Sequence, residues 1–274
     1  MNSAQKITSF SGLPARIATA LFALPLIYLA LRVGNPVLAF ALIAIGAVAS
    51  FETFNILKHM GYRFTPMIFV VCGATVVFMG MFNLFAVIIA SLMVTGVLTV
   101  ETILRSRNLD SIRIAFQGSL LLGYVSVPLA LLTLLSDRNN GFDWTILALA
   151  SVFMTDTFAY IFGRMFGRHA MAPTISPNKT WEGAIGGSIF GFITTLVMLR
   201  VTNIPWDIEM GVILAISLVI VAQFGDLFES KLKRIADIKD SGRIILGHGG
   251  MLDRLDSLLP VFALIYYASA NWPG

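Results

Sequence analysis

The sequence predicts an all-α, polytopic integral membrane protein, and three observations support this fold class. Hydrophobic residues make up 57% of the 274 residues and charged residues only 12%, whereas soluble domains carry about 25% charged residues. The mean hydropathy is +0.84. The apolar residues also fall into runs close to the roughly 20 residues that a helix needs to cross a bilayer. We therefore expect many spans and no large soluble domain.

Nine apolar runs are predicted to form transmembrane helices. The first follows Lys6 and Arg16, as in a signal peptide, but the run is long and another span comes at once, so we expect it to be retained. Only Asn83 separates the third run from the fourth, which predicts either a tight turn or one fused segment. The runs are 13–33, 36–56, 65–82, 84–103, 113–135, 143–162, 183–201, 210–228 and 257–272.

The basic residues predict the orientation of these spans. If the N-terminus is cytoplasmic, sixteen of the nineteen Lys and Arg residues lie on that side, and only Arg32, Arg138 and Arg200 lie opposite. Cytoplasmic loops are enriched in Lys and Arg, so we expect the N-terminus inside and the C-terminus outside. The two longest polar loops, 163–182 and 229–256, then share the cytoplasmic face. We divide the chain into N-terminal helices, 1–140, and a C-terminal region, 141–274, that carries both loops.

Charge and cysteine content exclude several classes of protein. The net charge of +4 gathers on the cytoplasmic face, which favours contact with anionic lipid or an anionic substrate over a nucleic-acid surface. The single cysteine, Cys72, excludes an internal disulfide and a cysteine-rich metal site. It lies in an apolar run, where we expect a small buried side chain.

Three carboxylates at the ends of apolar runs are candidate metal ligands. Asp226 follows the apolar run that ends at Phe224, and a carboxylate at the membrane boundary is costly unless it is paired or metal-bound. Asp253 and Asp256 stand three residues apart before the last run, and they share a face if that entrance is helical. Capping of the last helix is an alternative role. Mg²⁺ prefers carboxylate and phosphate oxygens, so the sequence predicts a Mg²⁺ site.

Basic and glycine residues lie between these carboxylates. If the eighth span continues as a helix, Lys233 shares a face with Asp226 and Glu229, although Glu229 and Lys233 are also spaced for a simple surface ion pair. The run 247–250, Gly-His-Gly-Gly, permits close approach of backbone N–H groups to phosphate, or it is only a turn. It lacks the spacing of a Walker A loop. For His248, contact with phosphate or metal and a structural role both remain open.

The other cytoplasmic loop carries a second group of candidates. Lys179 and Thr180 offer a charge and a hydroxyl suited to phosphate, and Trp181 is suited to the membrane interface; a basic loop without a ligand is the alternative. Asp156 and Glu52 are further acidic residues inside predicted spans, where ionisable groups are functional candidates. Small residues at positions 183, 187 and 191 share a helix face and predict close helix packing.

The charged segment resembles a known family signature. Ser230-x-Leu-Lys-Arg234, Lys239-Asp-x-Gly242 and His248-Gly-Gly-x-x-Asp-Arg-x-Asp256 resemble the signature of phosphatidate cytidylyltransferases, also called CDP-diacylglycerol synthases. Residues 156–167 and 176–183 resemble the segment that precedes it in that family. The likeness covers roughly residues 150–272. Leu246 departs from the family, which usually has Pro or Gly there, but every charged position is retained.

The resemblance implies a reaction and a set of site residues. CTP and phosphatidate would give CDP-diacylglycerol and pyrophosphate with Mg²⁺, in the cytoplasmic leaflet of the cell (inner) membrane, and a homodimer is expected. The implied catalytic residues are Lys233, Lys239, Asp240, His248 and Arg254; the substrate-binding residues are Lys179, Thr180, Ser230, Arg234, Gly249 and Gly250; and the metal ligands are Asp226, Asp253 and Asp256.

Two alternatives are compatible with parts of the pattern. Another CTP-dependent membrane transferase, such as a polyprenol kinase, would also need metal, basic residues and access for a lipid. An ion-coupled transporter would use intramembrane acids, but transporters place their sites near the bilayer midplane between internal repeats. Here the acids gather at the cytoplasmic ends of spans, and no repeat is visible, so we favour a transferase.

Overall fold

The computed structural model describes residues 25–105, 110–242 and 249–272. A helical segment, 25–33, precedes the labelled elements. The elements that follow are α3 (Val37–His59), α4 (Pro66–Met79), α5 (Leu84–Arg105), α6 (Asp110–Ser136), α7 (Gly141–Phe166), β1 (Ala170–Ala172), β2 (Ser176–Thr180), α8 (Trp181–Val201), α9 (Ile208–Ile235), α10 (Leu252–Leu255) and α11 (Leu258–Asn271).

Six of the described helices, α3 and α5 to α9, are long and apolar enough to cross a membrane. Two shorter apolar helices, α4 and α11, have 14 residues each and lie within the predicted runs 65–82 and 257–272. The molecule is therefore an all-α integral membrane protein, as predicted, apart from two short strands. Of the first predicted run, 13–33, only 25–33 lies among the described residues, so the count of nine spans stays a prediction.

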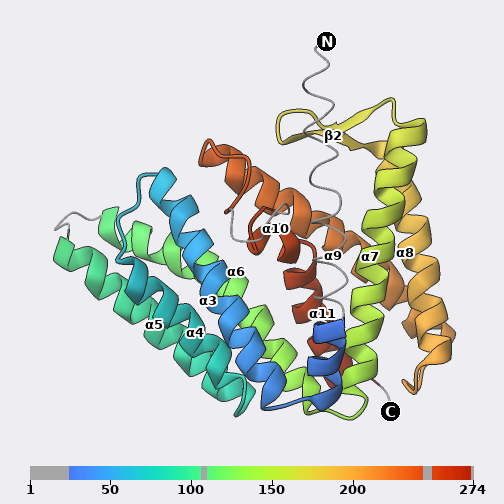
Figure 1. Cartoon of the computed structure of the whole chain (residues 1–274), viewed down its shortest axis with the longest axis horizontal. Coiled ribbons are helices and arrows are strands. Elements are labelled where there is room, and N and C mark those ends of the chain that lie inside the picture. Colours follow the sequence, from blue (N-terminus) through green and yellow to red (C-terminus); the bar gives the residue numbers. More distant parts are fainter. Residues whose placement is uncertain (1–24, 106–109, 243–248, 273–274) are drawn as a thin grey trace.

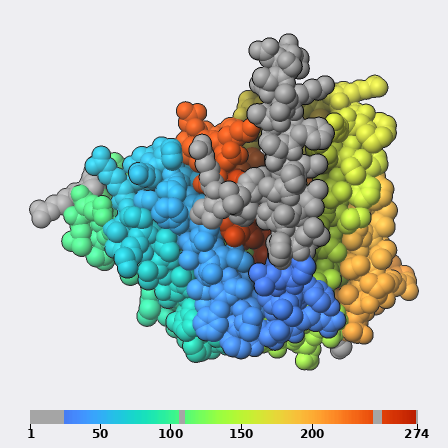
Figure 2. Space-filling model, in the orientation of Figure 1, coloured from blue at the N-terminus to red at the C-terminus, as the bar shows by residue number. Residues whose placement is uncertain are grey.

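The helices form two groups with α11 between them (Figure 1). Helices α3 to α6 lie on one side, and α7, α8 and the β hairpin lie on the other; α11 packs against α6, α7 and α9. The space-filling view shows parts of the C-terminal segment, in orange to red, between the two groups (Figure 2). One buried apolar cluster includes Leu129, Leu147 and Leu259, so the core crosses the predicted boundary at residue 140.

The outer surface of the helices is apolar. Phe85 and Leu92 of α5, Ile189 of α8 and Ile220 of α9 are all exposed. Soluble proteins rarely expose large contiguous apolar patches, whereas lipid tails are as apolar as these side chains. The exposed apolar side chains of α5, α8 and α9 therefore suit contact with the bilayer interior.

The predicted loop 163–182 contains more structure than the sequence suggested. Helix α7 continues to Phe166, and β1 and β2 form an antiparallel hairpin in which Ala170 pairs with Thr180 and Ala172 with Ser176. Thr180 then caps α8, because its Oγ1 accepts a hydrogen bond of 3.2 Å from the Gly183 backbone N–H. The hairpin thus places β2 directly before the N-terminus of α8.

Helices α7 and α8 pack closely along the small residues of α8. A Cβ added at Gly187 would lie 2.5 Å from the carbonyl oxygen of Thr155, and one at Gly191 would lie 2.0 Å from the Thr155 hydroxyl. No side chain fits at these distances without movement of α7. The close packing predicted for positions 183, 187 and 191 is confirmed.

Helix α9 carries the predicted charged face out of the apolar region. It begins after Asp207, whose Oδ1 accepts a 2.8 Å hydrogen bond from the Met210 backbone N–H, and such a cap satisfies an otherwise unpaired donor. The helix runs to Ile235, seven residues beyond the end of the predicted span. The segment between Ile235 and α10 therefore is shorter than the predicted loop 229–256.

Candidate active site

A buried ion pair on α9 lies at the centre of the charged segment. The Nζ of Lys233 lies 3.0 Å from Oε1 of Glu229 and 2.5 Å from Oδ1 of Asp253. The Glu229 side chain is fully buried and that of Lys233 only 12% exposed. The interpretation of Glu229 and Lys233 as a surface pair is therefore wrong. A buried carboxylate is costly without a counter-charge, so Lys233 is held between two acids that both favour its charged form.

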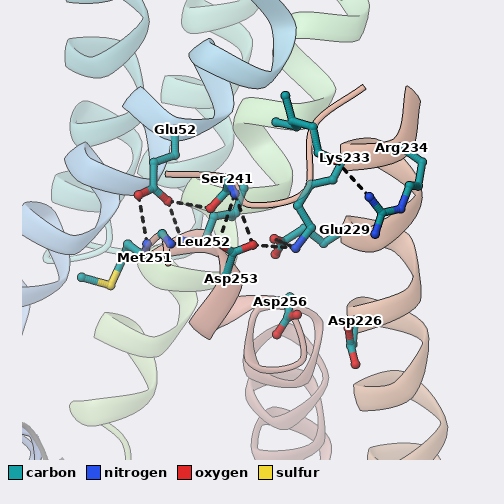
Figure 3. A network of polar contacts seen from close by, with 12 residues as sticks. Glu52, Asp226, Glu229, Lys233, Arg234, Ser241, Met251, Leu252, Asp253 and Asp256 are labelled. Atoms are coloured by element: carbon teal, nitrogen blue, oxygen red, sulfur yellow. Dashed lines mark hydrogen bonds and ion pairs between the residues drawn. The ribbon is translucent and has the colours of Figure 1, made fainter. Parts of the chain in front are cut away.

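Asp253 holds the start of α10 against α9. Its Oδ2 accepts hydrogen bonds from the backbone N–H groups of Ser241, at 3.0 Å, and Gly250, at 2.8 Å. Burial alone raises the pKa of this carboxyl, but the bonds from Lys233 and from the Gly250 N–H outweigh it and hold the pKa below its usual value. Both oxygens of Asp253 are thus engaged within the protein (Figure 3).

Asp256 and Asp226 form a second acidic group beside the first (Figure 3). Burial, together with the negative charge of Asp226, raises the pKa of Asp256 to about 7. One oxygen of Asp256 accepts a 2.7 Å hydrogen bond from the Ser257 N–H. Asp226 Oδ2 lies 2.5 Å from Nζ of Lys179 on β2. The hairpin therefore supplies a cation to a carboxylate on α9, which joins the two predicted cytoplasmic loops in one site.

The three predicted metal ligands fall into these two groups. Asp226 and Asp256 lie together, whereas Asp253 faces Lys233 and two backbone donors. Throughout the described ranges, no three or more His, Cys, Asp or Glu side chains are arranged to hold a metal ion. The Asp226 and Asp256 pair nevertheless suits a hard cation, because two carboxylates lie close together and the pKa of one is raised by its like-charged neighbour.

A cavity of about 310 Å³ opens beside Asp226 and Lys179. It lies among α7, α8, α9 and the hairpin, and its lining combines charged groups with apolar ones. Such a mixture suits a ligand with a charged head and an apolar remainder. The lining residues are Asp156, Ala159, Tyr160, Met171, Asn178, Lys179, Thr180, Gly183, Ala184, Gln223, Asp226 and Leu227.

Asp156, which the sequence marked as an intramembrane acid without a role, lines this cavity. Gln223 also lines it, and its side-chain amide donates to the carbonyl of Ala184, at 3.2 Å, and to the hydroxyl of Ser188, at 2.8 Å. These two bonds connect α9 to α8 at the cavity wall. Sequence reasoning missed Gln223, although a lone amide inside the apolar run 210–228 was the available signal.

Other predicted residues occupy varied positions. Arg234 donates to the carbonyl oxygens of Ile175, at 3.0 Å, and Ile238, at 3.3 Å, so it ties the hairpin to the end of α9. Ser230 is half-buried on α9. Lys239, Asp240 and Arg254 are exposed, Gly249 is half-buried and Gly250 is buried. His248 and Leu246 lie outside the described residues.

Glu52 belongs to the same polar network, although it comes from α3. Its carboxylate accepts hydrogen bonds from the backbone N–H groups of Met251 and Leu252 and from the hydroxyl of Ser241 (Figure 3). The only signal for this residue in the sequence was its place as an acid in an apolar run, and its partners could not be predicted. Ser241 was missed altogether.

Comparison with known proteins shows the family to which the chain belongs. The sequence matches the cytidylyltransferase family over residues 14–271. It is 48% identical over 128 residues to a phosphatidate cytidylyltransferase of Staphylococcus haemolyticus, covering 47% of this chain and 49% of that one. A homologue of the same name from Staphylococcus saprophyticus is 43% identical over 145 residues, covering 53% and 56%.

A third such homologue, from Staphylococcus aureus, is 47% identical over 130 residues, which is 47% of this chain and 49% of that one. The chain thus spans about half the length of the curated relatives it matches. The family match, in contrast, extends over nearly all of the helices and includes every acidic and basic residue of the site described above. The chain therefore belongs to the cytidylyltransferase family.

Proposed function

We propose that this protein transfers the cytidylyl group of CTP to phosphatidate, giving CDP-diacylglycerol and pyrophosphate. The proposal rests on two ion pairs at the ends of apolar helices, in which Lys233 contacts Asp253 and Lys179 contacts Asp226. A cavity lined by charged and apolar residues lies beside the second pair. A lipid phosphate and a nucleoside triphosphate both need cations there. The names of the homologues point to the same pair of substrates.

The reaction requires positioning and charge neutralisation more than a protein nucleophile. A phosphate oxygen of phosphatidate forms a bond to the α-phosphorus of CTP, and the bond from that phosphorus to the bridging oxygen of the β-phosphate breaks. Pyrophosphate then leaves with the bonding electrons. Lys233 is fixed between Glu229 and Asp253, and we propose that its ammonium group holds phosphate oxygens in line.

We propose that further cations and hydrogen-bond donors contact the phosphates of the two substrates. Lys179 turns from Asp226 to a substrate phosphate, and Lys239, Arg254 and His248 act on the outer phosphates. Thr180, Ser230, Arg234 and the N–H groups of Gly249 and Gly250 complete the contacts, while Asp240 remains a catalytic candidate. Asp226 and Asp256 would hold Mg²⁺; when bound, the ion neutralises charge on the phosphate oxygens. Asp253 would join them only by releasing Lys233.

We also propose an arrangement for the whole protein in the membrane. We place the site in the cytoplasmic leaflet of the cell membrane, where CTP is available and phosphatidate enters from the bilayer. The N-terminus lies inside, the C-terminus outside, and nine helices cross the membrane. A homodimer is proposed on the family resemblance alone.

Labelled CTP tests the reaction. The full chain in detergent is incubated with phosphatidate, Mg²⁺ and CTP that carries ³²P at the α or the γ position. The α label is expected in lipid and the γ label in pyrophosphate, and a chelator is expected to stop both. A polyprenol-kinase-type reaction would instead move the γ label to lipid in a parallel incubation with a polyprenol in place of phosphatidate, because the γ-phosphoryl group needs a hydroxyl acceptor. Release of no pyrophosphate under any of these conditions would refute the proposed transfer.

A further inference from the structure

The carboxylate of Glu52 joins the N-terminal helices to the start of α10. Its Oε1 accepts from the Met251 N–H at 3.0 Å, and its Oε2 accepts from the Leu252 N–H at 2.8 Å and from the Ser241 hydroxyl at 3.1 Å. Glu52 is fully buried. Three hydrogen-bond donors therefore satisfy a buried carboxylate that lies far from them in sequence (Figure 3).

Two glycines make room for this carboxylate. A Cβ added at Gly242 would lie 2.3 Å from Oε1 of Glu52, and one at Gly250 would lie 2.6 Å from Oε2 and 2.0 Å from the Ser241 hydroxyl. At these distances a larger residue fits only if the segment moves or the Glu52 carboxylate and the Ser241 hydroxyl leave their places. The backbone at Gly242 and Gly250 thus closes directly onto the side chain of Glu52.

The same segment holds Asp253 from its other side. Ser241 uses its hydroxyl on Glu52 and its backbone N–H on Asp253, and Gly250 contacts Glu52 while its N–H donates to Asp253. Asp253 in turn contacts Lys233. An unbroken series of contacts therefore runs from α3 through Ser241 and residues 250–252 to the central lysine on α9.

We propose that Glu52 is a positioning residue for the transfer reaction. It sets the start of α10 and thereby fixes Asp253 against Lys233, although it touches neither of them. The inference rests on the proposed function for its kinetic part only. Loss of the anchor leaves the helices in place but lets Asp253 and its backbone donors drift, and a displacement of about 1 Å near a reacting centre can cost roughly 100-fold in rate.

Glu101 on α5 provides a matched control, because it is a second buried carboxylate that anchors a backbone N–H. Its Oε1 accepts from the backbone N–H of Thr65 at 2.5 Å and from the Thr65 hydroxyl at 2.6 Å, and Arg105 lies 3.3 Å away. None of these groups contacts the network around Lys233. A purely structural role for Glu52 predicts that the two carboxylates behave alike on substitution.

The test compares Glu52→Gln with Glu101→Gln in the purified full chain. Glutamine keeps the shape of the side chain, but its NH₂ group cannot accept. Whichever way the amide turns, either Met251 or both Leu252 and Ser241 lose their acceptor. We expect E52Q to lower kcat at least tenfold with little change in KM for CTP, whereas E101Q keeps kcat within twofold. Hydrogen exchange supplies a readout independent of turnover: E52Q should speed exchange at residues 249–257, and E101Q only near Thr65.

Ser241→Ala serves as a milder variant should E52Q fail to fold. It removes one of the three donors to Glu52, and we expect a smaller loss of kcat and faster exchange at residues 249–257. The inference is overturned if the substitutions leave that exchange unchanged, or if E52Q and E101Q lose activity equally. Should the wild-type chain transfer no cytidylyl group, the proposed function fails, and the exchange pattern alone still decides whether Glu52 anchors this segment.

Discussion

Lys233 lies within reach of two acidic side chains that come from different segments. Glu229 is one turn away on α9, and Asp253 is on α10. The first distance was predictable, because residues four apart in a helix are neighbours. The second was not, because it depends on how the chain returns after α9. The buried pair is therefore partly a local and partly a tertiary feature.

Replacing Lys233 with Met should show how much the fold is destabilised when the buried Glu229 loses its counter-charge. Glu229 then lacks its cation, and breaking such a pair typically destabilises a fold by about 3–5 kcal/mol. We therefore expect K233M to lower the melting temperature in detergent. We also expect turnover to fall by roughly 100-fold or more, as when an enzyme loses one donor that stabilises charge in the transition state. Thermal unfolding and the labelled-CTP assay measure the two effects.

The double variant E229Q/K233M separates these effects. The double variant removes the buried charge of Glu229 together with that of Lys233, and Asp253 keeps its backbone donors, so we expect stability to return part of the way towards that of the wild type. Activity should stay lost, because the central ammonium group of Lys233 is still missing. Recovery of activity in the double variant would contradict the role given to Lys233, and an undiminished stability of K233M would contradict the ion-pair argument.

If Asp256 holds Mg²⁺ as proposed, the response of the protein to Mg²⁺ should depend on pH. Its pKa is raised from 3.8 to about 7, so the folded state binds this proton more tightly than the unfolded state. Without metal, stability therefore falls as the pH rises between those values. Because a metal ligand must be deprotonated, Mg²⁺ should raise the melting temperature more at pH 8 than at pH 6.

Asp256→Asn should abolish the difference between the Mg²⁺-induced rises in melting temperature at pH 8 and at pH 6. Asp137→Asn, at an exposed position in the turn after α6, is the control and should keep it. Differential scanning fluorimetry in detergent, with and without Mg²⁺, gives this readout without any turnover. An equal Mg²⁺ response at both pH values would remove Asp256 from the metal site.

Helices α7 and α8 depend on small residues for their close approach. The recurrence of glycine every four residues in α8 predicted this packing, since such spacing places the glycines on one face. The hairpin before α8 was not predicted, because strands of three and five residues are too short for a clear alternation of polar and apolar side chains. It matters to the site, because it delivers Lys179 to Asp226.

Gly187→Ala should weaken the α7–α8 contact. The new Cβ would meet the Thr155 carbonyl oxygen at 2.5 Å and Ala159 Cβ at 2.8 Å, and overpacking typically costs about 1–3 kcal/mol. Gly96→Ala on α5 is the control, because nothing lies within 4 Å of its Cβ position and alanine favours a helix over glycine by about 1 kcal/mol. The melting temperature should fall for G187A only; equal values would contradict the packing argument.

On the scale of the whole molecule, the sequence was most informative about the helices. Hydropathy alone located the six long spans and the two short apolar helices of the described residues, because lipid demands long apolar runs with satisfied backbone groups. It was least informative about contacts across the fold. Glu52 meets Ser241, Met251 and Leu252 only after the N-terminal helices pack beside the C-terminal ones, and no local pattern encodes such a meeting.

The predicted orientation remains to be measured, and two exposed turns allow a direct test. Asn139 lies in the turn between α6 and α7, and Thr174 lies between β1 and β2; the two turns are at opposite ends of the helices (Figure 1). In a Cys72→Ala background, a membrane-impermeant maleimide should label N139C in intact spheroplasts. It should label T174C only after permeabilisation.

The distribution of basic residues supports this orientation. Arg32, Arg138 and Arg200 are the basic residues assigned outside, while Lys179 and Lys233 belong to the face that we propose meets cytoplasmic CTP. Labelling of T174C in intact spheroplasts would invert the orientation and place the proposed site away from its nucleotide. Labelling of both positions from outside would mean that an even number of spans separates the two turns, and the nine-helix arrangement would fail together with the cytoplasmic site.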